Sequence, residues 1–68
     1  MNLSRNRSGS LTLELSDSEL LILKSCLREA FAALDKRDFP LRVGAPMEHA
    51  ADIARELGDL MQRVGVEE

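Results

Sequence analysis

The chain has 68 residues, one cysteine, two aromatic residues and a formal net charge of −3. This length predicts one small domain that buries only about 60% of its unfolded surface, and a lone cysteine excludes an internal disulfide, so oligomerisation is the expected way to complete a core. The acidic balance disfavours nucleic acid and anionic membranes as partners, and the absence of a long apolar run or a signal peptide predicts a cytoplasmic protein.

The N-terminal segment divides into two parts. Residues 1–10 are rich in Ser, Arg and Asn and predict a flexible basic arm. Residues 11–15 are apolar at alternate positions, which predicts a short strand. A strand of this length needs a pairing partner, either from another copy or from this chain, where residues 39–43 alternate in the same way.

A capping box marks the start of the first helix. In the run Ser16-Asp17-Ser18-Glu19, the Ser16 hydroxyl can accept from the Glu19 amide while the Glu19 carboxylate accepts from the Ser16 amide. A helix over residues 17–35 follows. Its apolar arc spans about half of the cylinder, whereas a helix with one partner needs an arc of about 100°. The excess predicts an intermolecular contact, and the core or interface residues of this helix are Leu20, Ile22, Leu23, Cys26, Leu27, Ala30, Phe31 and Leu34.

The connector, residues 36–45, is expected to be extended, because a proline disfavours helical geometry in the residue before it, here Phe39. The second helix is predicted over residues 46–64, with Pro46 in its first position and Gly65 as a left-handed cap. Its core or interface residues recur every three or four positions: Met47, Ala50, Ala54, Leu57, Gly58, Met61 and Val64.

These elements predict a mainly α fold. Residues 11–66 form a single domain in which the two helices pair as an antiparallel hairpin behind a short N-terminal β-strand, and residues 67–68 form a tail. Two or four copies would bury the remaining apolar faces in a homo-oligomeric helical bundle.

Few residues are candidates for chemistry. Cys26 lies inside the apolar arc with no base beside it, which indicates a packing residue. His49, Asp52 and Glu56 share one side of the second helix and could in principle hold a divalent metal, but acids three or four residues apart are normal on a solvated helix face and no second histidine completes a ligand set. The sequence therefore predicts no catalytic residue, no cofactor and no metal, and hence a protein that is not an enzyme.

Two resemblances bear on function. The order of basic arm, strand, helix and helix resembles the ribbon-helix-helix DNA-binding proteins, whose paired strands enter the major groove; Thr12 and Glu14 would then face the bases, where a carboxylate is repelled. The chain also resembles short uncharacterised bacterial proteins with a strand, a long helix, a Phe-x-x-Arg-x-Gly connector and a final helix. Phe39, Arg42 and Gly44 match that connector, and no activity is implied by it.

The leading prediction is a self-associating protein that acts through protein–protein interaction. An alternative is an antitoxin or immunity-type protein that neutralises a basic partner, because residues 45–68 carry six acids against two arginines, a balance of −4. A second alternative is a DNA-binding regulator of the ribbon-helix-helix kind.

Overall fold

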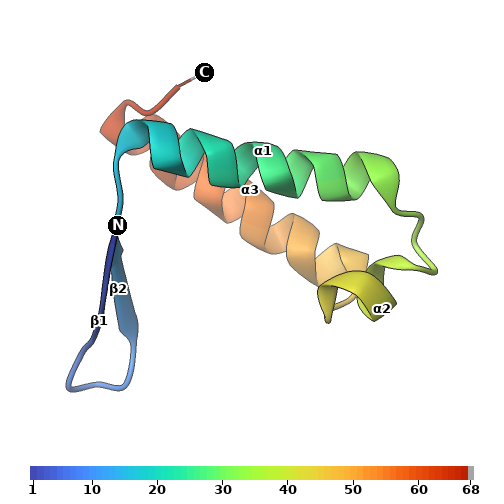
Figure 1. Ribbon diagram of the computed structural model, residues 1–68, viewed down its shortest axis with the longest axis horizontal. Coiled ribbons are helices and arrows are strands. Elements are labelled where there is room, and N and C mark those ends of the chain that lie inside the picture. The colour runs from blue at the N-terminus through green and yellow to red at the C-terminus, as the bar shows by residue number, and fades with distance from the viewer. Residues whose placement is uncertain (68) are drawn as a thin grey trace.

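The computed structural model describes residues 1–67, and Glu68, half of the predicted tail, lies outside them. The elements in chain order are β1 (Asn2–Arg5), β2 (Leu11–Glu14), α1 (Asp17–Ala33), α2 (Phe39–Val43) and α3 (Met47–Val64). Figure 1 shows a β-hairpin projecting from one end of a helical layer, with α3 running back alongside α1 and α2 covering the other end. The prediction of a mainly helical fold is confirmed.

The N-terminus is more ordered than predicted. Strand β1 pairs antiparallel with β2, with Leu3 opposite Leu13. In the turn between them, the Asn6 amide donates to the Ser10 carbonyl at 2.8 Å and Gly9 adopts a left-handed φ of +91°. The expected flexible arm at residues 1–10 is therefore a strand and a tight turn, and the partner of β2 comes from this segment rather than from residues 39–43.

The first helix begins as predicted. The Glu19 amide donates to Ser16 Oγ at 3.2 Å and the Ser16 amide donates to Glu19 Oε1 at 2.8 Å, so the capping box is confirmed. The helix ends at Ala33, two residues before the predicted end, because Leu34 turns to an extended conformation while its amide still donates to the Ala30 carbonyl.

The connector is partly helical, which corrects the expectation of an extended segment. Pro40 lies in the first turn of α2, where its missing N–H removes no helical hydrogen bond. Before the helix, the Asp38 backbone amide donates a hydrogen bond to Asp35 Oδ1 at 2.8 Å. Gly44 ends the helix with a φ of +90°. The tolerance of a helix start for proline therefore outweighs the extended preference of the residue before it.

Helix α2 contributes the side chain with the smallest exposed fraction among residues 1–67. Phe39 is 1% exposed and stacks on Phe31 of α1, with 5.2 Å between the ring centroids. Helix α2 itself lies at the end of the layer where α1 and α3 diverge (Figure 1). The other buried side chains of residues 1–67 are Ala50, Met61 and Val66.

The end of α3 closes this small core. Gly65 is in the left-handed conformation predicted for it, with a φ of +78°. The chain then folds back, so that the Val66 amide donates to the Met61 carbonyl at 2.9 Å and the Val66 side chain is buried. Pro46 precedes α3 as its N-cap, one position earlier than predicted.

Candidate interaction surface

Helix α1 carries far more apolar surface than the chain itself covers. Ten of its 17 residues are apolar, yet none is buried. The row facing α3, which includes Leu20, Leu27 and Phe31, is only half-buried. On the outer side, Ile22 is 63% exposed and Cys26 is also exposed. A helix in the core of a monomer would bury several such side chains.

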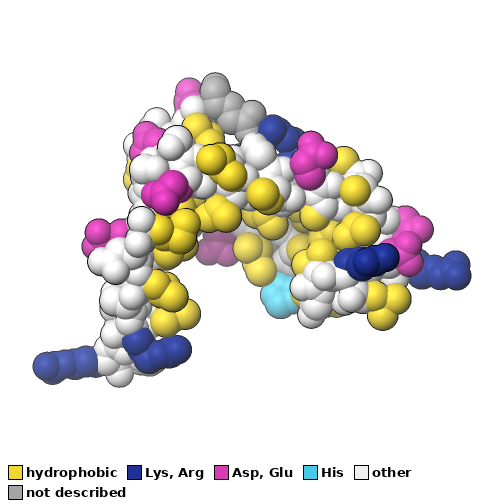
Figure 2. All heavy atoms as spheres, viewed as in Figure 1, with side chains coloured by type: hydrophobic (Ala, Val, Ile, Leu, Met, Phe, Trp, Pro, Cys, Tyr) yellow, Lys and Arg dark blue, Asp and Glu magenta, His cyan; other side chains and the backbone are white. Residues whose placement is uncertain are grey.

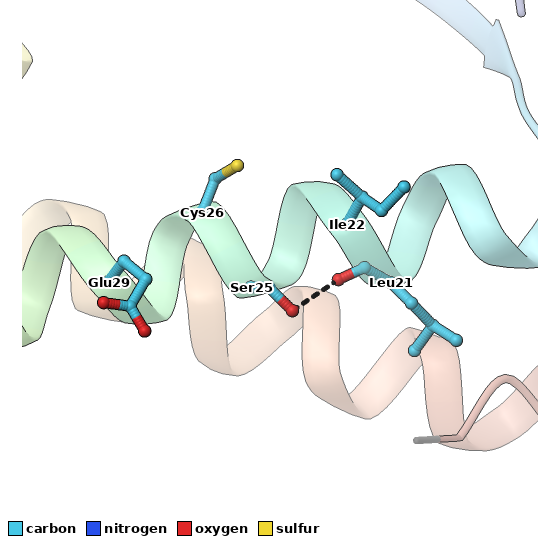
Figure 3. A pocket seen from close by; sticks show the side chains of 5 residues that line it. All are labelled: Leu21, Ile22, Ser25, Cys26 and Glu29. Atoms are coloured by element: carbon cyan, nitrogen blue, oxygen red, sulfur yellow. Dashed lines mark hydrogen bonds between the residues drawn. The ribbon is translucent and has the colours of Figure 1, made fainter.

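An open groove of about 520 Å³ runs along the outer side of α1, lined by Leu21, Ile22, Ser25, Cys26 and Glu29. In Figure 3, Ile22 and Cys26 point away from α3, whereas Leu21 points towards it. The Ser25 hydroxyl donates to the Leu21 carbonyl at 2.9 Å, so it is already satisfied within the helix. The groove therefore suits apolar side chains.

Helix α3 carries a second exposed row. Ile53 and Leu60 are about half exposed, Val64 is 75% exposed, and half-buried Leu57 completes a spacing of four, three and four residues along one side of the helix. At about 100° per residue, this row lies about 90° round α3 from its buried row.

The matching row of α1 contains Leu23, Cys26 and Ala30. It also lies about 90° from the row that faces α3, in the same rotational sense. Because the two helices run in opposite directions (Figure 1), equal rotations bring both rows to the same side of the helical layer.

The β-hairpin adds a third apolar element. Paired and alternate residues share a face of a hairpin, so Leu3, Leu11 and Leu13 lie together, with exposed fractions of 61%, 56% and 45%, on a face that also carries Arg5 opposite Leu11. The opposite face is polar and consists of Asn2, Ser4, Thr12 and Glu14. In Figure 2 the hydrophobic side chains of the hairpin lie on its side towards the helices and continue into a hydrophobic band beneath α1.

These three elements form one surface, which we call the inner apolar face. It consists of Leu3, Leu11 and Leu13 of the hairpin, Leu23, Cys26 and Ala30 of α1, and Ile53, Leu57, Leu60 and Val64 of α3. It occupies the angle between the hairpin and the helical layer (Figures 1 and 2).

Two exposed ion pairs lie outside the inner apolar face. Lys36 Nζ lies 2.9 Å from Glu48 Oε1, and this hydrogen bond raises the pKa of Lys36 and lowers the pKa of Glu48. Arg55 pairs with Asp52, which raises the pKa of Arg55. Exposed pairs of this kind contribute little to stability.

Residues 1–67 meet the requirements neither of a metal site nor of a membrane span. Among residues 1–67, no three His, Cys, Asp or Glu side chains gather closely enough to hold a metal ion, and Asp52 of the His49, Asp52 and Glu56 set is paired with Arg55. Within the same range, every helix is too short or too polar to cross a bilayer.

The residues predicted as core or interface divide into three groups. Ala50 and Met61 are buried; Ile22, Leu23, Cys26 and Val64 are exposed; half-buried are Leu20, Leu27, Ala30, Phe31, Leu34, Met47, Ala54, Leu57 and Gly58.

Other contributors were missed by the sequence patterns. Phe39 and Val66 belong to the core, and Leu3, Ile53 and Leu60 belong to the inner apolar face. One signal was available for Val66, because an apolar residue after a left-handed glycine cap commonly packs back onto its helix.

The inner apolar face has the composition of a protein interface: aliphatic side chains over two helices and a hairpin, with Arg5 beside the hairpin leucines and the two ion pairs outside it. No protein-family model, no curated protein and no solved structure matches this chain.

Proposed function

We propose that this protein is a non-enzymatic, self-associating helical protein that acts through protein–protein interaction. The observation that carries the proposal concerns helix α1. Ten of its 17 residues are apolar, and none of them is fully buried within the chain. Such a helix is stable in water only when another surface covers it, because helical stability in proteins comes mainly from packing of the apolar face.

The accessible surface supports a second copy as that cover. The chain exposes 5535 Å², whereas a compact monomer of 7.6 kDa exposes about 4,300 Å². The difference of about 1,200 Å² exceeds the roughly 800 Å² that each partner buries in a standard interface and lies in the range of obligate homodimers. The radius of gyration, 13.5 Å, is likewise larger than the roughly 11 Å of a compact chain of this length.

The solution mass tests this proposal. Light scattering on a sizing column over a wide concentration range should give at least twice the 7.6 kDa of one chain. Leu60→Glu, on the inner apolar face, should lower the mass towards that of the monomer, because a buried, unpaired carboxylate is costly. Gln62→Glu introduces the same group two residues away and should leave the mass unchanged. A wild-type chain that is folded and monomeric at every concentration would refute the proposal.

A second candidate function uses the other side of α3. Glu48, Asp52, Glu56 and Asp59 are all exposed there, on the side of α3 away from its buried row and outside the inner apolar face. This acidic side supports an antitoxin or immunity-type role towards a basic partner protein. Reversing two charges, Glu56→Lys with Asp59→Lys, should abolish binding to a partner purified from native cells while the oligomer mass stays the same. Unchanged binding would eliminate this candidate.

The hairpin departs from the ribbon-helix-helix arrangement. One edge of β2 is taken by β1 of the same chain, whereas that arrangement pairs the strands of two copies. Glu14 also lies among the polar side chains of the hairpin that would approach the major groove of DNA, where its carboxylate would be repelled by the phosphates. DNA binding is therefore not part of the proposed function.

A further inference from the structure

The β-hairpin poses a problem that its own chain does not solve. A two-stranded hairpin is at best marginally stable in water unless its apolar face is packed. All eight strand residues are exposed, including the three leucines that share one face. Some other apolar surface must cover those leucines for the hairpin to persist.

The groove on α1 is an open, mainly apolar hollow, and the hairpin cannot reach the groove of its own chain. Only Leu15 and Ser16 connect β2 to α1, so the link spans at most about 7 Å. With so short a link, the hairpin projects from the start of α1 (Figure 1). This keeps its leucines short of Ile22 and Cys26, which lie in the second and third turns of that helix.

We propose that the hairpin of each copy packs its leucine face onto the α1 groove of a second copy, so that two chains exchange arms about a twofold axis. This inference rests on the proposed self-association and adds where the two copies meet. A twofold axis makes each chain both donor and acceptor of an arm, which covers both hairpins and both grooves at once. The groove lined by Ile22 and Cys26 is therefore filled by three side chains of another copy: Leu3, Leu11 and Leu13.

The surface area is consistent with this exchange. Packing of helices alone would leave the hairpin leucines in water, whereas an exchanged arm adds its apolar face to the contact. The excess of about 1,200 Å² per chain is more than the roughly 800 Å² of a standard interface, so it leaves room for a contact over both the hairpin and the helices.

A matched pair of hairpin variants tests the arm. Leu13→Glu places a carboxylate on the leucine face, and Ser4→Glu places the same group on the polar face of the hairpin, at the position paired with Thr12. We expect Leu13→Glu to raise the dimer dissociation constant by about 100-fold, the range of an interface hot spot, and Ser4→Glu to change it less than about threefold. Far-ultraviolet circular dichroism of both variants at high concentration checks that the helices are retained.

The outcomes separate the two proposals. If the wild-type chain dimerises and Leu13→Glu and Ser4→Glu have the same dimer dissociation constant, the arm exchange is overturned and self-association is left standing. A wild-type chain that is monomeric throughout would overturn both. A loss of helix in Leu13→Glu but not in Ser4→Glu would be followed by the trapping experiment below.

Cys26 provides that independent readout. Leu13→Cys, oxidised at a concentration where the dimer forms, should give a covalent dimer whose cross-linked peptides join position 13 of one chain to Cys26 of another. Ser4→Cys, on the polar face of the hairpin, is the control and should give no such cross-link. A link between position 13 and Cys26 found only within one chain, or no link at all, would overturn the exchange.

Discussion

Phe39 allows the sharpest test of how this small core is held together. The side chain is 1% exposed, and its ring stacks on Phe31 where α1 and α3 diverge. Truncation of a buried phenylalanine to alanine costs about 3 to 5 kcal/mol of unfolding free energy, of which about 0.5 to 1.5 kcal/mol reflects ring stacking. Because the site lies at the end of the helical layer and Phe31 is itself half-buried, partial collapse is feasible and we expect about 3 kcal/mol.

That loss is large for this chain. A domain of 68 residues has a total stability of roughly 3 to 10 kcal/mol, and a loss of about 3 kcal/mol lowers its Tm by about 12 to 24 °C. Wild type, Phe39→Ala and Leu41→Ala should be melted under circular dichroism at one protein concentration, since the Tm of an oligomer depends on concentration.

Leu41 is the matched control, because it lies on the same short helix and is 83% exposed. Its truncation should change stability by less than about 0.5 kcal/mol. Equal shifts for the two variants would show that α2 does not fill the end of the layer, and the account of the core given above would fail.

Three further predictions concern local features. Ser16→Ala should lower the unfolding free energy by about 1 kcal/mol in urea titrations, because the Glu19 amide loses its cap; an equal loss in Ser18→Ala would contradict this. The Ser16 backbone amide, with a smaller contribution from its hydroxyl, holds the pKa of Glu19 below its ordinary value of 4.5. The stability linked to this group is therefore present above pH 4.5 and is lost as the pH falls below it; Glu19→Gln, which keeps the capping hydrogen bonds, should flatten this fall between neutral and acidic melts. Gly65→Ala should destabilise the protein by about 1 kcal/mol because residue 65 has a positive φ. Gly58→Ala should be neutral or stabilising by up to about 1 kcal/mol, since only the flexible end of a lysine would contact the new methyl group. Thermal melts that reverse this order of stability would refute the reasoning.

Features that depend on a few neighbouring residues were predictable from the sequence. The capping box at Ser16 and Glu19 and the left-handed cap at Gly65 are each completed within one turn of chain, so their residues suffice to specify them. The connector was mispredicted because Pro40 is compatible with two local conformations. The burial of Phe39 against Phe31 selects the helical one, and that contact is tertiary.

The hairpin was missed for a different reason. A composition rich in Ser and Asn suggested disorder, but Asn6 Nδ2 donates to Ser10 Oγ and to Thr12 Oγ1, both at 3.0 Å, and thereby organises the turn. The excess apolar arc of α1 was visible in the sequence. The sequence did not show that this arc lies beside the row of α3 that includes Ile53 and Leu60, because that arrangement depends on the rotation of each helix about its own axis in the packed pair.

The short sequence separation of the contacts within the hairpin and the helices also has a kinetic consequence. The hairpin closes through a five-residue turn, and each helix forms from its own neighbours, so nearly every early contact is local in the chain. Hairpins and helices of this kind form in about 10 μs or less. Arm exchange needs an encounter between two chains, so its rate is set by protein concentration. Refolding should therefore show a fast gain of helix at a rate independent of concentration, followed by a slower phase that accelerates in proportion to the concentration of chains.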